Sequence, residues 1–290
     1  MTSLAAPRLL LRPRLFGLLI GGPAAIWQAL FFVAPIVFLV ALSFWVVRNF
    51  RMVPAFDTVN WIRMLTRDVF WDAYLQTLSL AAATAVLASV IAFPAAYALA
   101  FRASPQLRRF CTLLLITPFF TSYLVRIYAW QVFLLNDGII NAVLGQLGLG
   151  PYAMLSTQGA TIVGYLTLSL PLVVLIQLLS LSNVDRHLVE AAHNLGCSPW
   201  GAVFRIVIPS ARAGLCLAAL FAFILTFGDF ASPLYLGGGE TTLSILITDV
   251  TKSGQQWPRA AVVAITMILT LLAVAFAVLK FAYARQGSRS

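Results

Sequence analysis

The sequence has few charged residues, and this scarcity excludes a soluble globular protein. Asp, Glu, Lys and Arg together make up 10% of the 290 residues, whereas hydrophobic residues make up 61% and the mean hydropathy is +0.93. Soluble domains carry roughly 25% charged and 45–50% apolar residues. Since a soluble core of this size cannot hide such an excess of apolar side chains, most of the chain must lie in lipid.

Residues with the chemistry of metal sites and disulfides are also rare. The two histidines are His187 and His193, and the three cysteines, Cys111, Cys197 and Cys216, are odd in number and widely spaced. This pattern excludes a disulfide framework and gives no reason to expect a zinc site or another metal centre. The sequence has no G-x-x-x-x-G-K-[ST] motif either. We therefore expect no ATP hydrolysis, no catalytic residue and no cofactor in this chain.

Acidic residues are scarcer than basic ones, 9 against 19, which gives a net charge of +10. In a soluble protein such a charge would suggest nucleic acid binding. Here the basic residues lie mainly between apolar runs, where Lys and Arg fix the orientation of membrane helices. If the N-terminus is cytoplasmic, twelve of the 19 basic residues lie on that side and the other seven on the opposite side. We therefore expect both termini in the cytoplasm and no nucleic acid partner.

Long apolar runs are what the sequence does contain. A helix needs about 20 apolar residues to cross a bilayer, whereas barrel strands would alternate apolar and polar residues. Six runs predict an all-α integral membrane protein with six transmembrane helices in a single transmembrane domain, residues 24–281. The expected spans are 24–47, 75–100, 111–134, 160–181, 214–236 and 260–281, between a cytoplasmic N-terminal segment, 1–23, and a cytoplasmic tail, 282–290. The first run begins at Leu15 and is too long for the core of a cleaved signal peptide.

The loop between the fourth and fifth spans, residues 183–212, has the signals of two short amphipathic helices. Asp185 suits the N-cap of the first helix, and Gly196 suits the left-handed residue after its end. Ser198 and Pro199 suit the N-cap and first residue of the second helix, which we expect Pro209 to end. Apolar residues fall at helical spacing on both helices: Leu188, Ala191, Ala192 and Leu195 on the first, and Trp200, Val203, Phe204 and Val207 on the second. Either the membrane and the chain's own spans cover these stripes, or a soluble partner docks on them.

Seven positions of this loop resemble the EAA loop of binding-protein-dependent ABC importer permeases: Glu190, Ala191, Ala192, Gly196, Ile206, Ile208 and Pro209, with Ile208 where Leu is usual. The resemblance implies the type I ABC importer permease fold with cytoplasmic coupling helices, in which this loop sits on an ATP-hydrolysing subunit. The ATPase-coupling residues would then be Glu190, Ala191, Ala192, Gly196, Ser198, Pro199, Ile206 and Pro209.

The same resemblance implies a set of partners and a place in the cell. The partners are a second homologous permease subunit, two ATP-binding subunits that hold ATP and Mg, and an extracytoplasmic substrate-binding protein. The chain would lie in the lipid bilayer of the bacterial inner (plasma) membrane and move its substrate by alternating access. A secondary transporter and a membrane scaffold are the alternative classes, and neither accounts for the loop.

Two charges stand inside apolar runs, Arg126 and Asp229, and each costs about 2.5–3.5 kcal/mol in a membrane helix. In one interpretation they pair with each other or reach the outer interface. In the other, Asp229 is an acid in the substrate pathway of a cation. Aromatic faces attract organic ammonium groups, so Tyr235, Phe230 and Trp130 are candidate neighbours.

The segments around these charges, residues 117–130, 136–141 and 228–238, resemble the first permease subunit of spermidine/putrescine importers. This finer resemblance implies a polyamine substrate and a heterodimeric permease pair. Relatives with similar motifs carry opines, ferric iron, thiamine or phosphonates, so those substrates are alternatives within the same class.

Overall fold

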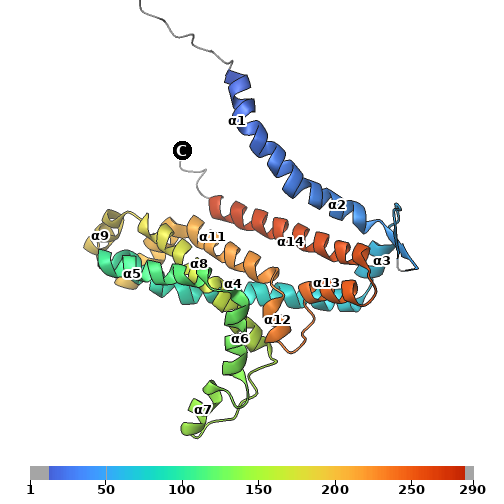
Figure 1. The fold of residues 1–290 in the computed structure, drawn as a ribbon. Helices are drawn as coiled ribbons and strands as arrows, with labels where there is room; N and C mark the ends of the chain where they lie inside the picture. The colour runs from blue at the N-terminus through green and yellow to red at the C-terminus, as the bar shows by residue number, and fades with distance from the viewer. Residues whose placement is uncertain (1–12, 50, 285–290) are drawn as a thin grey trace, which may run out of the picture.

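The computed structural model describes residues 13–49 and 51–284 (Figure 1). Apart from an antiparallel hairpin, β1 (Val46–Arg48) paired with β2 (Arg51–Val53), its regular structure is helical. The helices are α1 (Pro13–Gln28), α2 (Ala34–Ser43), α3 (Val59–Leu65), α4 (Asp68–Phe101), α5 (Pro105–Ile116), α6 (Tyr123–Leu134), α7 (Ile139–Gln146), α8 (Gln158–Ser182), α9 (Arg186–Asn194), α10 (Pro199–Ala202), α11 (Ile208–Phe227), α12 (Ala231–Tyr235), α13 (Leu243–Lys252) and α14 (Trp257–Tyr283). Residues 1–12 of the expected N-terminal segment and 285–290 of the expected tail lie outside the described residues.

Six helical segments of the described chain are long and apolar enough to cross a membrane, which confirms the predicted all-α fold with six transmembrane helices. They are Gly21–Ser43, Asp68–Phe101, Tyr123–Gln146, Gln158–Ser182, Pro199–Phe227 and Trp257–Tyr283. The first combines α1 and α2 through a π-helical turn at Ala29–Val33, and it ends at Ser43, where the chain turns into β1.

Three long helices, α4, α8 and α11, pack together as the core of the bundle and run side by side in Figure 1. The buried face of α4 is a row of small side chains, each at most 7% exposed: Ala81, Ala85, Ala88, Ala92, Ala96 and Ala100. Small residues let membrane helices approach closely, so that van der Waals contacts hold them together. Helices α8 and α11 approach closely at Gly214 of α11, where an added Cβ would lie 2.3 Å from the Cβ of Ser180 in α8.

The expected third span, residues 111–134, is not one helix. Helix α5 ends at Ile116, a 3₁₀ turn follows at Thr117–Phe120, and α6 begins at Tyr123. The reason is Pro118, which has no N–H to continue the α-helical hydrogen bonds. The hydroxyl of Thr117 donates to the Leu113 carbonyl at 3.0 Å, and that of Thr121 donates to the Pro118 carbonyl at 2.9 Å. Both carbonyls also accept backbone N–H groups, so the hydroxyl bonds brace the break, after which α6 projects away from the bundle (Figure 1).

The expected fifth span, residues 214–236, is also divided. Helix α11 ends at Phe227, and the short helix α12 starts after Gly228 and Asp229. Figure 1 shows α12 between the end of α11 and the projecting helix α6. The break therefore brings Asp229 to a junction of helices, where its contacts decide its role.

Candidate functional site

The two short helices predicted in the loop 183–212 are present, and their predicted caps are in place. The Asp185 carboxylate accepts a hydrogen bond from the His187 N–H at 2.9 Å and begins α9. Gly196 has a φ of +81°, a left-handed conformation that penalises a Cβ. The Ser198 hydroxyl accepts a bond from the Gly201 N–H at 3.1 Å, and Pro199 opens α10. The capping predictions are confirmed.

The prediction that Pro209 ends the second helix is wrong. Helix α10 continues through a π-helical turn, Val203–Val207, into the spanning helix α11. In this turn the Ile208 N–H donates to the Val203 carbonyl, five residues back. The wider turn resets the hydrogen-bonding register, so that Pro209 stands in the first turn of α11, where its missing N–H costs little. The loop is therefore rigidly continuous with a membrane helix.

Most apolar residues of the loop's predicted stripes are exposed in the chain. On α9 only Ala192 is buried, while Leu188 is 51% exposed and Leu195, just after the helix, 89%. On the second helix Val203 and Val207 pack into the bundle, whereas Trp200 is 74% exposed and Phe204 63%, with their rings stacked. The exposed set, Leu188, Leu195, Trp200 and Phe204, is called the loop apolar surface below. Surfaces of this kind mark sites of contact with another protein or with a membrane.

Glu190 lies on the same helix as Leu188, with its side chain 69% exposed. Its carboxylate is 3.6 Å from Nδ1 of His187, one helical turn earlier. Ala191 is exposed next to it, and Ile206 is partly buried on the π-helical turn. The predicted coupling residues therefore share one end of the bundle, and Glu190 remains accessible to a partner.

Two arginines fasten the ends of the loop to other spanning helices. Arg186 donates to the Ala100 carbonyl at the end of α4, at 3.0 Å. Arg212 donates to the Ala282 carbonyl near the end of α14, at 2.7 Å. Both arginines bind carbonyls that helix ends leave without an internal partner, and they also oppose the negative end of the helix dipole. A force on the loop is thus transmitted to α4, α11 and α14.

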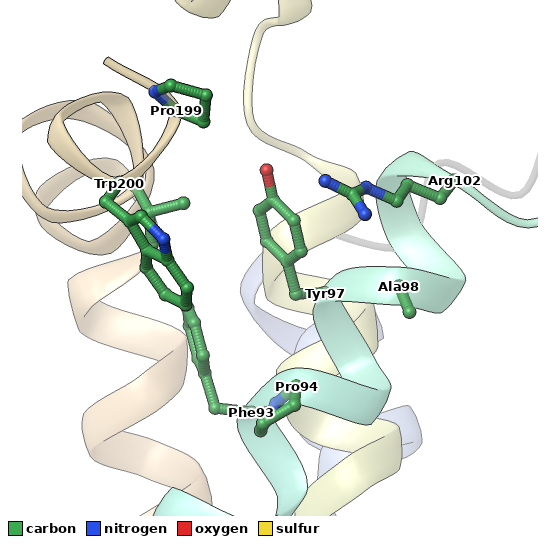
Figure 2. Close-up of a pocket in the computed structure, with 8 residues that line it drawn as sticks. Phe93, Pro94, Tyr97, Ala98, Arg102, Pro199 and Trp200 are labelled. Atoms are coloured by element: carbon green, nitrogen blue, oxygen red, sulfur yellow. The ribbon is translucent and has the colours of Figure 1, made fainter.

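A cavity of about 300 Å³ separates the loop from α4 (Figure 2). Its lining combines Phe93, Pro94, Tyr97, Ala98 and Arg102 of the α4 end with Pro199, Trp200 and Val203 of the loop. Figure 2 shows the ring of Phe93 below the indole of Trp200, while the Tyr97 hydroxyl and the Arg102 guanidinium lie on the other side. The sequence analysis gave no functional role to the residues of α4 that line this cavity. Their signal was an aromatic pair at i and i+4 just before the basic end of the second span.

Asp229 is held by three donors at the junction of α6, α11 and α12. Its Oδ1 accepts from the Ala231 N–H at 3.1 Å, and its Oδ2 accepts from the Ser232 N–H at 3.0 Å. The Tyr123 hydroxyl of α6 donates to the same Oδ2 at 2.7 Å and lies 2.6 Å from the Ser232 hydroxyl. A carboxylate with such partners caps α12 and ties α6 to it. Tyr123 and Ser232 both lie in the sequence motifs, where nothing local gave either of them a role.

Arg126 does not pair with Asp229. Its Nη1 donates to the Thr167 carbonyl of α8 at 3.2 Å, and its guanidinium lies 5.7 Å from the centre of the Tyr123 ring. Within residues 13–49 and 51–284 no Lys or Arg side chain lies within 4.0 Å of a carboxylate; the one pair of an acidic and a basic side chain at that distance is His187 with Glu190. Arg126 thus ties α6 to α8, as Asp229 ties α6 to α12.

The aromatic residues predicted around Asp229 have different neighbours. The Tyr235 ring lies 5.1 Å from that of Tyr128, and the Trp130 ring 5.9 Å from that of Phe133. Trp130 and Tyr235 pack in one small apolar cluster beside α6, while Phe230 is 49% exposed. They do not form a shared aromatic cage in this conformation.

Comparisons with known proteins agree with this architecture. Residues 88–286, more than half of the chain, match a family described as "Binding-protein-dependent transport system inner membrane component". The chain is 29% identical over 255 residues to the spermidine/putrescine transport system permease protein PotB of Haemophilus influenzae, covering 85% of this chain and 87% of that protein.

Two solved structures share the fold. One is a bacterial ABC transporter involved in the import of the acidic polysaccharide alginate, with a TM-score of 0.76 at 17% identity, covering 94% of this chain and 96% of that one. The other is a bacterial alginate ABC transporter in complex with an alginate pentasaccharide-bound periplasmic protein, with a TM-score of 0.69 at 17% identity and 96% of both chains covered. At this identity the likeness concerns the fold alone.

Proposed function

Because the chain belongs to the family of binding-protein-dependent transport system inner membrane components, we propose that it is a permease of an ATP-driven importer whose loop 183–212 docks on an ATPase subunit. The observation that carries the docking proposal is the loop apolar surface. Leu195 is 89% exposed, on the same loop as the accessible carboxylate of Glu190, and this loop is fastened to three spanning helices. Family membership also favours this class over a secondary transporter or a scaffold.

In this proposal each coupling residue has a physical task. Glu190 offers a charge to a basic residue of the ATPase, and Ala191 is small enough for close approach of a partner helix. Ala192, Ile206 and the turn residues Gly196, Ser198, Pro199 and Pro209 keep the two helices in a fixed shape. The loop lies in the cytoplasm with both termini. ATP and Mg bind to the two partner subunits, and this chain catalyses no reaction.

Transport proceeds by alternating access. When ATP brings the partner subunits together, they draw the loops of two permeases toward each other, and the pair opens outward. Substrate then enters from the extracytoplasmic binding protein, and ATP hydrolysis restores the inward-facing state. The long anchored helices suit this task because rigid elements transmit displacement, whereas a flexible loop would absorb it.

The second permease and the binding protein need surfaces of their own. We assign the contact with a second, homologous permease, in a heterodimer, to the first span, Gly21–Ser43, which is almost wholly exposed, and to α6. The proposed binding surface for the binding protein consists of the outer segments 48–72, 136–159 and 237–259. One of them is braced by Asn141, whose amide donates to the Tyr152 carbonyl at 2.9 Å and accepts from the Tyr152 N–H at 3.0 Å.

We propose a polyamine as the substrate. The support is the similarity to the PotB permease of a spermidine/putrescine system, which extends over 85% of the chain. The fold supplies no support of its own, since the structural neighbours serve an acidic polysaccharide. The test is uptake of labelled spermidine by cells that carry the transporter, with competition by putrescine, an opine, ferric iron, thiamine and a phosphonate. Competition by one of the last four and not by putrescine would reassign the substrate.

The docking proposal is tested in the whole complex, purified from membranes with its ATPase, second permease and binding protein. Glu190→Lys reverses the accessible charge, and Gly196→Val puts a β-branched residue at a φ of +81°. We expect both variants to insert normally. The ATPase activity stimulated by loaded binding protein should fall at least about tenfold, which corresponds to a loss of about 1.4 kcal/mol in coupling free energy. Glu190→Asp and Gly196→Asn are the matched controls, since Asp keeps the negative charge and Asn tolerates a left-handed backbone. Full stimulation in both Glu190→Lys and Gly196→Val would refute the docking proposal.

A further inference from the structure

A groove opens between α5 and α8 at the same end of the bundle as the loop 183–212. It encloses about 950 Å³, which makes it larger than the cavity against α4. Its walls are aliphatic, and two wall residues stand open to the surroundings: Leu113 of α5 is 65% exposed and Leu179 of α8 is 66% exposed. Ile116 is partly buried along the same wall. This part of the groove has the character of a surface that faces hydrocarbon.

Three arginines line the groove at the end nearest the loop: Arg108, Arg109 and Arg186. No acidic residue lines it. Arg108 donates to the Ser182 hydroxyl of α8, and Arg186 donates to the Ala100 carbonyl at 3.0 Å. Each of these two side chains is therefore fixed in direction. Arg109 is exposed, and its side chain forms no ion pair with another residue of the described chain.

The three guanidinium groups give this groove a net positive charge, and no acidic residue of its lining balances it. Within the described residues no carboxylate lies within 4 Å of them. Guanidinium groups bind phosphate oxygens through two parallel hydrogen bonds, and fixed arginines lose little entropy in doing so. A ligand that also covers the aliphatic walls must carry hydrocarbon next to its anionic group.

We propose that this groove binds an anionic phospholipid of the adjacent leaflet. Its phosphate lies against Arg108, Arg109 and Arg186, and an acyl chain runs along Leu113, Ile116 and Leu179. Basic pockets at the ends of membrane helices bind lipid headgroups in this way. A free phosphate would leave the aliphatic walls uncovered, and a neutral lipid would leave the charges without a counter-ion.

The position of Arg186 gives the lipid a structural consequence. Arg186 is the first residue of α9, so a phosphate shared with Arg108 and Arg109 links the loop 183–212 to α5. The lipid proposal is argued from the shape and charge of the groove and does not require the proposed transport function. Only the assignment of the lipid to the cytoplasmic leaflet rests on the orientation proposed above.

The test measures lipid that stays with the complex. The complex is purified in mild detergent and reconstituted in vesicles that hold phosphatidylglycerol and phosphatidylethanolamine, then re-extracted, and its retained lipid is counted by native mass spectrometry. We expect the wild type to retain phosphatidylglycerol selectively. We expect Arg109→Gln, and more strongly the pair Arg108→Gln with Arg109→Gln, to retain less, by about fivefold or more for the pair, because charge-assisted bonds to phosphate are lost.

Two further variants test whether the groove itself, and not the overall positive charge of the chain, retains the lipid. Leu113→Trp keeps all three charges and fills the groove, so it should also lower retention. Arg102→Gln removes a charge from the end of α4 but lines the cavity against the loop instead, so retention should not change. Equal retention in wild type and Arg109→Gln, or equal binding of the two lipids, would overturn the proposal.

A photoreactive amino acid at position 113 identifies what covers the groove in the assembled complex. Attachment to phospholipid supports the proposal. Attachment to the second permease would show that protein covers the groove and would overturn the proposal. The proposal would also be overturned if inorganic phosphate fully displaced the lipid from the complex. The proposed coupling role would stand in these cases, because ATPase stimulation is measured separately and depends on Glu190 and Gly196.

Discussion

The loop 183–212 and the junction around Asp229 both depart from plain membrane helices, and they differ in what they leave unsatisfied. At the junction, three donors from α6 and α12 complete the carboxylate of Asp229. At the loop, Leu195 and Trp200 stay open although the loop's backbone is well capped. A group whose partners are all internal holds the chain together, whereas a surface without internal partners awaits another molecule. The difference favours a structural role for the junction and supports the proposal that the loop contacts a partner.

The largest effect is expected from Asp229→Ala. The change leaves the Ala231 and Ser232 N–H groups without their acceptor inside the membrane domain and removes one of the two partners of the Tyr123 hydroxyl. Hydrogen bonds to charged groups contribute about 1.5–3 kcal/mol each, so we expect a loss of about 3 kcal/mol or more in the free energy of unfolding. The readout is the thermal unfolding of the purified complex in detergent.

Asp229→Asn is the matched variant that distinguishes the two roles of this residue. Its amide oxygen still accepts from the donors on one side but not on the other, so the complex should lose less stability than Asp229→Ala, while uptake should stay close to wild type. If Asp229 instead attracted a cationic substrate, Asp229→Asn would abolish uptake although the complex was less destabilised than Asp229→Ala. That result would move Asp229 into the substrate pathway and end the contrast between the two regions.

A smaller effect is expected from Leu195→Ser on the loop. Leu195 is 89% exposed, so the stability of the permease itself should change by less than about 0.5 kcal/mol. Docking should suffer more, because burying a leucine side chain against a partner contributes about 1.5–3 kcal/mol. We expect roughly tenfold weaker retention of the ATPase subunit during purification.

The control for Leu195→Ser is Leu147→Ser. Leu147 follows α7, far along the chain from the loop, and is 70% exposed. ATPase retention should be unaffected by this change. Equal losses of ATPase retention in the two variants would mean that non-specific hydrophobic contact of exposed leucines holds the ATPase. The loop would then not be its specific docking site.

The smallest effect is expected from Gly196→Ala. No atom lies within 4 Å of an added Cβ, so the change tests the φ of +81° alone. A left-handed conformation costs an L-residue about 1–2 kcal/mol, and part of this strain relaxes in an exposed turn. We expect a local cost of about 1 kcal/mol, seen as faster amide hydrogen exchange in α9.

Gly145→Ala is the counterpart for Gly196→Ala. Gly145 also has open space around its Cβ position but lies within α7 at an ordinary φ. Alanine favours helix over glycine by up to about 1 kcal/mol, so exchange in α7 should slow or stay the same. Faster exchange in both helices would mean that glycine loss, and not the left-handed turn, is responsible.

Local signals in the sequence predicted the local features of the molecule. The caps at Asp185 and Ser198 and the turn at Gly196 depend on residues within a few positions of each other, and all three are confirmed. The spanning helices follow from apolar run length, because lipid rather than tertiary contact selects them. Such local signals wrongly predicted that the helix ends at Pro209, since a π-helical turn before the proline lets the helix continue.

Contacts between distant residues were not predictable from one sequence. Tyr123 lies 106 positions from Asp229, and Arg126 lies 41 positions from Thr167. Charge scarcity singled out Arg126 and Asp229, and in one interpretation the two paired with each other or reached the outer interface. The break at Thr117–Phe120 redirects α6 and gives each of them a different partner.

The alanine row on α4 has a mechanical consequence. Large side chains of packed helices interdigitate, so that one helix can move along the other only if the whole contact repacks. A face built from Ala85, Ala88, Ala92 and Ala96 is nearly smooth. Small displacements of α8 and α11 along this face would therefore require little repacking of its side chains, as in shear motions of packed helices. The part of α4 that packs through its smallest side chains is in this respect also suited to small relative movements of the helices.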